Sequence, residues 1–350
     1  MPNRGAFAVS EAVARDRLHA SHRYTWPMPA VSVIATVLNE SRRIPRLVPA
    51  LLALDPPAAE IVIVDGGSKD GTWEWLAAEA EKSPSLKPIR DETCNIKRSA
   101  GPISRGRNVA IAASTSELIA CADAGCTYTP DWLARLTAPL VEGKAEYTLG
   151  GSCLDLTDAT IWDLASAPYF GVKLTPDVPS KSCTARSMAF TKSLWQRVGG
   201  FPESAFFGED TLFDQQVRSV TPPFFVERAK AFYRPQYSFG FACRQFGGYS
   251  KSDGILGVRP ARLTRNAARC LIEVAALAAL PWTWIPLALV MVMILHFAFL
   301  PDRLIVLNRQ PKVLAARLVF SLLVPWLIAI NHLHGKFSKK HPMNAQNRTS

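Results

Sequence analysis

The sequence predicts an α/β fold with a doubly wound, mostly parallel sheet, followed by apolar C-terminal helices. Apolar, strand-like runs alternate with helix-like segments between residues 31 and 154. Three of these runs are apolar throughout, which is typical of strands covered on both faces. Near the C-terminus, no residue from Val274 to Leu300 carries a formal charge, and that length is sufficient to cross a bilayer.

The first half of the chain repeats a β-α-β rhythm. Right-handed crossovers are expected between its strands, with ligands bound outside the strands' carboxyl ends. We expect strands at residues 31–37, 60–64, 86–90, 117–122 and 145–150. Helices are expected between them at residues 42–54, 71–81, 103–113 and 130–141. Later elements are a short helix near residue 161, strands at 182–190 and 224–233, and helices at 192–198 and 210–220.

The distribution of charge divides the chain. Residues 259–350 carry 12 Lys and Arg against 2 Asp and Glu, whereas the whole chain carries 40 against 29. A nucleic-acid-binding protein would place the basic excess on its folded domain, so we expect no nucleic acid as a partner. The pattern instead resembles cations beside a membrane face. We therefore expect a lead-in at 1–29, a globular domain at 30–258 and a basic-flanked membrane segment with a polar tail at 259–350.

Two apolar stretches within the last segment, at about 270–300 and 313–334, are candidates for contact with lipid. Pro281 and Pro286 interrupt the first, so a tilted helix and a re-entrant hairpin are both open. The second is shorter and could span or lie in the interface. Seven Cys without C-x-x-C spacing, and no apolar signal segment at the start, favour a reducing compartment. We expect an inner-membrane protein whose globular domain faces the cytoplasm.

Acidic residues follow the predicted strands at their carboxyl ends. Asp65 ends the second strand and precedes Gly66-Gly67-Ser68, where glycine permits a tight turn and close approach of a ligand. Its carboxylate could accept hydrogen bonds from a base or a ribose. An ordinary turn is the alternative. The first strand ends in Val37 and is followed by Asn39 and Glu40, without the G-x-G-x-x-G fingerprint of dinucleotide cofactors.

Two further acidic positions suit metal and proton chemistry. Asp123 ends the fourth strand and could hold Mg²⁺ or Mn²⁺ on a diphosphate, although an N-cap partner is the alternative. Glu209 and Asp210 open a helix, where acidic residues are also favoured by the dipole. Asp210 could act as a general base, with Glu209 orienting it. Arg107 and Asn108, which precede the Asp123 strand, could contact phosphates or hold the nucleotide loop.

Four blocks together resemble the family 2 glycosyltransferases of the GT-A fold: VSVIATVLNES, EIVIVDGGSKDGT, SRGRNVAIAASTSELIACADAGCTYTPDWL and GGFPESAFFGEDTLFDQQVR. The resemblance implies an inverting hexosyltransferase that uses a nucleoside-diphosphate sugar and a divalent cation. It implies that Asp210 is the catalytic base beside Glu209 and that Asp123 is a metal ligand. The nucleotide would be bound by residues Val37, Asn39, Glu40, Asp65, Gly67, Arg107 and Asn108.

The chain departs from that family pattern in two places. The metal-binding D-x-D motif reads Asp123-Ala124-Gly125, so its second carboxylate is missing. The Q-x-x-R-W block of processive synthases is absent, which favours transfer of one sugar per event. The membrane segments favour a lipid-linked or glycan acceptor in cell-surface polysaccharide or glycolipid synthesis. The alternatives are a nucleotidyltransferase and a non-catalytic membrane protein with a transferase-like fold.

Overall fold

The computed structural model describes residues 29–157, 159–170, 183–235, 237–279, 291 and 311–338. The expected lead-in and most of the first apolar stretch lie outside the described residues. The chain divides into two compact units. Unit 1 comprises residues up to 158, 176–203 and 209–234; unit 2 comprises residues 159–175, 204–208 and 235 onward.

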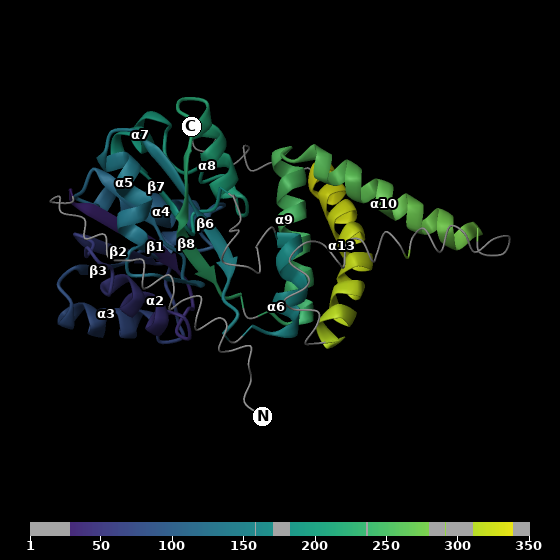
Figure 1. Ribbon diagram of the computed structural model, residues 1–350, viewed down its shortest axis with the longest axis horizontal. Coiled ribbons are helices and arrows are strands. Elements are labelled where there is room, and N and C mark those ends of the chain that lie inside the picture. The colour runs from purple at the N-terminus through teal and green to yellow at the C-terminus, as the bar shows by residue number, and fades with distance from the viewer. Residues whose placement is uncertain are drawn as a thin grey trace. The chain divides into compact units, whose positions relative to one another are not determined.

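Unit 1 is built on one eight-stranded sheet with the order β3-β2-β1-β4-β7-β6-β8-β5 (Figure 1). Its pairs β1–β2, β1–β4, β2–β3 and β6–β8 are parallel, and β7 is antiparallel to both β4 and β6. The predicted doubly wound, mostly parallel sheet is confirmed. The strands are β1 Val31–Val37, β2 Glu60–Asp65, β3 Leu86–Arg90, β4 Leu118–Cys121, β5 Cys126–Tyr128, β6 Tyr147–Leu154, β7 Met188–Thr191 and β8 Phe224–Tyr233.

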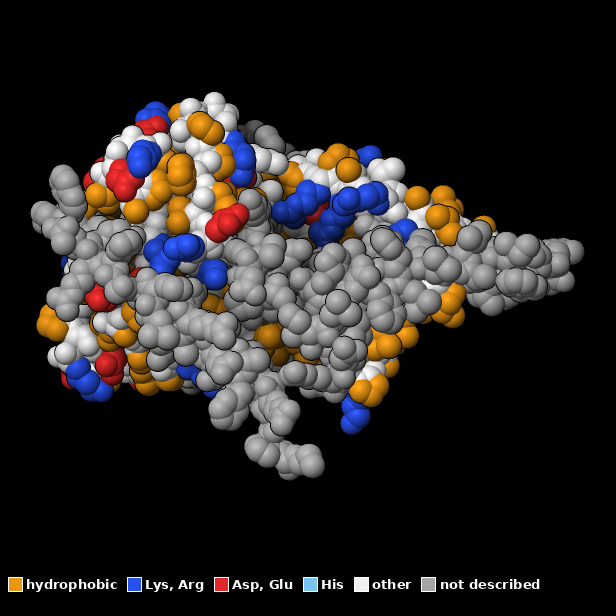
Figure 2. Space-filling model, viewed as in Figure 1, with side chains coloured by type: hydrophobic (Ala, Val, Ile, Leu, Met, Phe, Trp, Pro, Cys, Tyr) orange, Lys and Arg blue, Asp and Glu red, His pale blue; other side chains and the backbone are white. Residues whose placement is uncertain are grey.

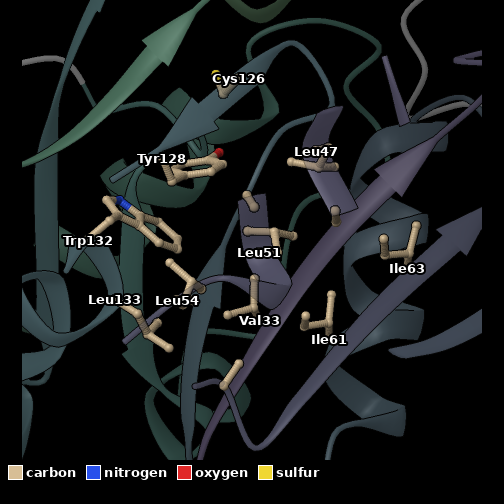
Figure 3. Packing of buried hydrophobic residues seen from close by; sticks show 14 of the residues in the cluster. Val33, Leu47, Leu51, Leu54, Ile61, Ile63, Cys126, Tyr128, Trp132 and Leu133 are labelled. Atoms are coloured by element: carbon tan, nitrogen blue, oxygen red, sulfur yellow. The ribbon is translucent and has the colours of Figure 1, made fainter. Parts of the chain in front are cut away.

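Helices cover both faces of this sheet because alternate strand residues point to opposite sides. On one face, Val33 of β1 packs in a core cluster with side chains of α2, α3 and α5, of which Figure 3 shows Leu47, Leu51 and Trp132. On the other face, Ile34 packs with side chains of α4, α7 and α8. The helices are α2 Ile44–Leu52, α3 Thr72–Lys82, α4 Pro102–Ala113, α5 Trp132–Val141, α7 Lys192–Arg197 and α8 Glu209–Arg218, with a 3₁₀ turn η1 at Glu92–Cys94.

Unit 2 is helical in its described part. It contains α6 Ile161–Ser166, the 3₁₀ turn η2 Ala167–Phe170, α9 Phe239–Leu256, α10 Pro260–Ala279 and α13 Pro311–Phe337. Helices α9 and α13 approach each other closely at two glycines. A Cβ at Gly254 would lie 2.0 Å from the carbonyl oxygen of His332, and a Cβ at Gly335 would lie 2.0 Å from the carbonyl oxygen of Lys251, so only glycine allows this approach. Aromatic side chains including Phe246 of α9 and Phe320 of α13 form its core.

Two elements differ from the sequence expectation. Strand β5 has three residues and exists through antiparallel pairing with β8, which is far along the chain. Helix α9 was not expected because Gly247, Gly248 and Gly254 lower its intrinsic propensity. Its packing against α13 supplies the stabilisation that propensity does not.

Candidate functional site

The carboxyl ends of β1, β2 and β4 form one edge of the sheet in unit 1. Val37 at the end of β1 pairs with Asp65 at the end of β2. On the other side of β1, the Ala122 N–H donates to the Ile34 carbonyl at 2.8 Å, so Asp123 follows at the same edge. Two strand spacings separate β2 from β4, which places Asp65 and Asp123 roughly 10 Å apart across the sheet.

Asp65 is fully buried, and among the described residues only one of its two carboxylate oxygens has hydrogen-bond partners. Its Oδ1 accepts hydrogen bonds from the backbone N–H groups of Gly67 and Ser68, each at 2.8 Å. Gly67 has a φ of 89°, the left-handed backbone that glycine adopts without strain. Its Oδ2 is buried and finds no hydrogen-bond partner in the described part of the chain. A buried acceptor without a donor is costly, so Oδ2 is suited to a ligand's hydroxyl or N–H.

The loop after β1 is tied to the loop after β2. The Asn39 N–H donates to Ser68 Oγ at 2.8 Å, and the Lys69 N–H donates to Asn39 Oδ1 at 3.0 Å. The Glu40 N–H donates to Thr72 Oγ1 at 2.8 Å. Asn39 has a φ of 55°, a conformation that asparagine tolerates better than most residues. These bonds give the backbone beside Asp65 a fixed shape.

Glu40 faces the same edge as Asp123. Its carboxylate forms an ion pair with Arg43 at 3.0 Å. Burial raises the pKa of Glu40 above its ordinary value; Arg43 opposes this shift, and the negative charges of Asp123 and Asp70 add to it. Negative charge is therefore concentrated at this edge, which favours a positively charged ligand group or a cation.

Asp123 lies in a turn that is held by a tyrosine. Its Oδ1 accepts a hydrogen bond from the Gly125 N–H at 3.1 Å. Its own N–H donates to Tyr128 Oη at 2.9 Å, and that hydroxyl donates to the Arg186 carbonyl at 3.0 Å. In the ranges that the structure describes, no group of three or more His, Cys, Asp or Glu side chains could hold a metal. A cation at Asp123 would therefore need oxygens of the substrate or water.

The Glu209-Asp210 pair opens helix α8, as the sequence predicts. Glu209 Oε1 lies 2.7 Å from Arg107 Nη1, and both side chains are less than 10% exposed. Arg107 also lies over the Phe201 ring, 5.3 Å from its centroid. This buried pair joins the start of α8 to helix α4.

Helix α4 in turn lies against the edge that carries Asp65 and Asp123. A Cβ at Gly106 would lie 2.8 Å from Thr36 Cγ2, so the absence of a side chain there lets α4 approach the carboxyl end of β1. Arg107, the next residue, holds Glu209. The start of α8 is thus anchored to the carboxyl end of β1.

The carboxyl of Asp210 is desolvated, although part of the residue reaches the surface. Burial and the adjacent charge of Glu209 raise the pKa of Asp210 to about 6, against the opposing effects of Arg107, Arg186 and a hydrogen bond from the Thr211 N–H. The Thr211 N–H lies 2.7 Å from Asp210 Oδ1. A carboxyl with a pKa near 6 is ionised at neutral pH and is a better base than an exposed aspartate.

Asn108 has four hydrogen bonds within the protein. Its Nδ2 donates to the Phe201 carbonyl at 2.9 Å and to Glu203 Oε1 at 3.0 Å. Its Oδ1 accepts from the Phe201 N–H at 2.9 Å and from Trp195 Nε1 at 3.1 Å. These contacts hold the chain before α8.

Sequence reasoning missed Tyr128, Arg186 and Tyr233. Arg186 Cζ lies 4.1 Å from the centroid of the Tyr233 ring, and Tyr128 links the backbone of Arg186 to that of Asp123. No spacing in the sequence marks them, because they come from β5, the segment before β7 and the end of β8. Antiparallel pairing of Cys126 with Tyr233 brings two of these segments together.

Part of the chain is similar to known proteins. Residues 32–191 match the model of glycosyl transferase family 2. The glycosyltransferase AglE of Haloferax volcanii is 27% identical over 203 residues, which cover 53% of this chain. The chain matches 60% of the length of AglE, less than two thirds of that relative.

One solved structure with a TM-score above 0.5 supports the fold. The mannosyltransferase PcManGT from Pyrobaculum calidifontis, in complex with GDP-Man and Mn²⁺, is similar with a TM-score of 0.59 and 17% identity, covering 93% of this chain and 96% of that one. Residues 1–349 of TarS from S. aureus give a TM-score of 0.46 at 17% identity, over 88% and 90% of the two chains. The GT-A fold expected from the sequence is confirmed.

Proposed function

We propose that this chain, whose residues 32–191 form a glycosyl transferase family 2 domain, moves one sugar from a nucleoside-diphosphate sugar to an acceptor hydroxyl with inversion. The observation that carries the proposal is the desolvated carboxyl of Asp210. The adjacent Glu209 pairs with Arg107, and this pair anchors the start of α8 beside the sheet edge that bears Asp65 and Asp123. The bound GDP-Man of PcManGT supports this donor class.

In this mechanism Asp65 Oδ2 accepts a hydrogen bond from the nucleoside, with the tied loops of Asn39 and Gly67 shaping the pocket for base and ribose. Asp210 takes the proton of the acceptor hydroxyl as its oxygen bonds to the anomeric carbon. The bond from that carbon to the diphosphate breaks on the opposite side, and its electron pair leaves with the nucleoside diphosphate. General-base catalysis of this kind contributes roughly a hundred- to ten-thousand-fold in rate.

Asp123 is the residue that would hold a divalent cation, Mg²⁺ or Mn²⁺. When bound, such an ion supplies positive charge to a leaving diphosphate. Arg107 and Asn108 act indirectly and do not contact the donor in this mechanism, because their side chains hold Glu209 and the chain before α8. We assign them to positioning the base.

The surface of unit 2 supports an acceptor carried by lipid. Leu271 and Leu277 of α10 are 71% and 63% exposed, and Ile330 of α13 is 60% exposed. Figure 2 shows Lys and Arg side chains gathered over the start of α10, where Arg259, Arg262 and Arg265 lie, and hydrophobic side chains farther along. Apolar side chains next to basic ones are typical of helices that bind anionic membranes.

Helix α13 is long and apolar enough to cross a membrane, with a mean hydropathy of 2.3 over its most apolar window, half of which is buried within the protein. We propose attachment to the inner membrane with unit 1 facing the cytoplasm, where nucleotide sugars are made. The acceptor would be a lipid-linked glycan of a cell-surface polysaccharide or a glycolipid.

A donor assay tests the proposed function. Purified protein in detergent is incubated with UDP-, GDP- and dTDP-sugars, Mn²⁺ and a membrane lipid extract, and the released nucleotide is identified. We expect one donor class to yield nucleoside diphosphate. Release of pyrophosphate would indicate a nucleotidyltransferase, and absence of both release and nucleotide binding would indicate a non-catalytic protein; either result would refute the proposal.

A further inference from the structure

Gly125 occupies the position at which the D-x-D pattern has its second carboxylate, and the ring of Tyr233 lies close to the space that a side chain would need there. A Cβ at Gly125 would lie 3.1 Å from Cε2 and 3.5 Å from Cδ2 of Tyr233. The shorter distance is tighter than an ordinary contact, so a side chain at this position would require the ring to shift by a few tenths of an ångström. The ring is held in place because its backbone pairs with Cys126 in the β5–β8 ladder.

An arginine lies on that same ring. The guanidinium carbon of Arg186 is 4.1 Å from the Tyr233 ring centroid, a distance typical of a cation–π contact. The Arg186 carbonyl and the Asp123 N–H share the hydroxyl of Tyr128. Asp123 and Arg186 are therefore positioned by one tyrosine.

The positive charge of Arg186 acts on groups of the candidate site. It lowers the pKa of Asp210 against the dominant effect of burial. Burial raises the pKa of the Cys126 thiol. The negative charge of Asp123 raises this pKa further, and the positive charge of Arg186 lowers it. Arg186 therefore lies within electrostatic range of both ends of the candidate site.

We propose that Arg186, held on the Tyr233 ring, binds the diphosphate of the donor and takes over part of the charge neutralisation that a second metal-binding carboxylate and its cation would provide. An edge with two carboxylates repels a diphosphate until a cation binds. Here the second carboxylate of the motif is absent, and the guanidinium of Arg186 adds positive charge near Asp123. A guanidinium can bind two phosphate oxygens at once and remains charged at every physiological pH.

The inference rests on the proposed function and makes a specific claim about it: binding of a nucleoside diphosphate depends less on a divalent cation than on Arg186. Calorimetric titration with UDP and with GDP tests this, each in excess Mn²⁺ and in excess EDTA. For the wild type we expect whichever nucleotide binds to retain its affinity within about tenfold in EDTA, since about 1.4 kcal/mol corresponds to tenfold.

Arg186→Ala should weaken binding by at least about tenfold in EDTA and leave it strongly dependent on Mn²⁺, because the fixed positive charge is lost. Arg186→Lys keeps the charge but not the bidentate geometry, so its affinity for the nucleotide should lie between that of the wild type and that of Arg186→Ala. Tyr233→Ala should resemble Arg186→Ala, whereas Tyr233→Phe keeps the ring and should resemble the wild type. Arg244→Ala, which removes an arginine lying over Phe241 in α9, is the matched control and should not change binding.

Two results would overturn the inference alone: wild-type binding in Mn²⁺ that disappears in EDTA, or equal affinity of Arg186→Ala and the wild type under both conditions. Absence of binding to either nucleotide by the wild type with Mn²⁺ would refute the proposed function as well. Circular dichroism of each variant shows whether it is folded, and Arg186→Lys and Tyr233→Phe keep the test decisive if the alanine variants do not fold.

Discussion

The two compact units contain buried carboxylates in different surroundings. In unit 2, the buried carboxylate of Asp253 is neutralised by two arginines, Arg259 at 3.1 Å and Arg262 at 3.0 Å. In unit 1, Asp65 keeps a buried oxygen without a partner among the described residues, and the carboxyl of Asp210 is desolvated. Unsatisfied polar groups cost stability, and such groups concentrate at functional sites. Unit 2 also exposes apolar side chains of α10 and α13, a feature that favours a binding surface.

The largest effect is expected from Asp210→Asn. The change removes the proposed base while keeping the size of the side chain, so transfer should fall by roughly a hundred- to ten-thousand-fold with little change in nucleotide affinity. Initial rates and calorimetry measure the two quantities.

Asp214→Asn is the matched control in the same helix. The Asp214 carboxylate accepts a hydrogen bond from Tyr147 Oη and pairs with Arg218, so its replacement should lower the melting temperature without changing the transfer rate of the folded protein. Full transfer by Asp210→Asn would remove the residue from the mechanism.

The buried Glu209–Arg107 pair offers a second test. Glu209→Gln leaves Arg107 buried without a counter-charge and should lower the free energy of unfolding by about 3–5 kcal/mol. Denaturant titration measures it. The double change Glu209→Leu with Arg107→Met should cost less than the sum of the single changes, because no lone charge remains buried. The surface pair Arg197–Glu146, of which each side chain is about 45% exposed, is the control, and Glu146→Gln should change stability by less than about 1 kcal/mol. Equal costs for the two pairs would contradict the anchoring role.

The exposed apolar face of unit 2 should bind lipid. Replacing Leu271 and Leu277 with Glu removes two apolar side chains from the interface, each worth about 1.5–3 kcal/mol when fully buried. We expect binding to vesicles of anionic phospholipid to weaken by tenfold or more per residue, as measured by flotation, while transfer to a water-soluble acceptor is kept. Val220→Glu changes an exposed apolar residue of unit 1 and should leave flotation unaltered. Unchanged vesicle binding by the double variant would indicate that unit 2 has another partner.

The smallest effect concerns pH. The pKa of Asp210 is raised to about 6, so the protonated form, which cannot act as a base, accumulates below that value. The kcat/KM of the wild type should therefore fall about tenfold per pH unit below pH 6 and be level above it. Because burial raises the pKa, the ionised carboxylate destabilises the fold as pH rises through 6, and Asp210→Asn should be more stable than the wild type at pH 8 but not at pH 4. A profile that is flat from pH 4 to 8 would contradict the assignment.

The sequence predicted unit 1 better than unit 2 for a physical reason. Strands β1, β2 and β4 are buried on both faces and therefore read as continuous apolar runs, so the positions of Asp65 and Asp123 at their ends could be foreseen. The link from Glu209 to Arg107 spans 102 residues, and no local pattern encodes it. Nor could the Tyr233 ring over Gly125 be foreseen, since it depends on the pairing of a three-residue strand. Helix α9 depends on its glycines meeting α13, which propensity alone does not reveal.

A crystal structure of the protein with its nucleoside-diphosphate sugar would test the central claim most directly. The account predicts the nucleoside at Asp65, the diphosphate between Asp123 and Arg186, and the anomeric carbon facing Asp210. Unit 1 also has an open groove of about 500 Å³ lined by residues that include Arg105, Trp195 and Glu203. A donor bound in that groove, with Asp65 Oδ2 still lacking a partner, would contradict the account.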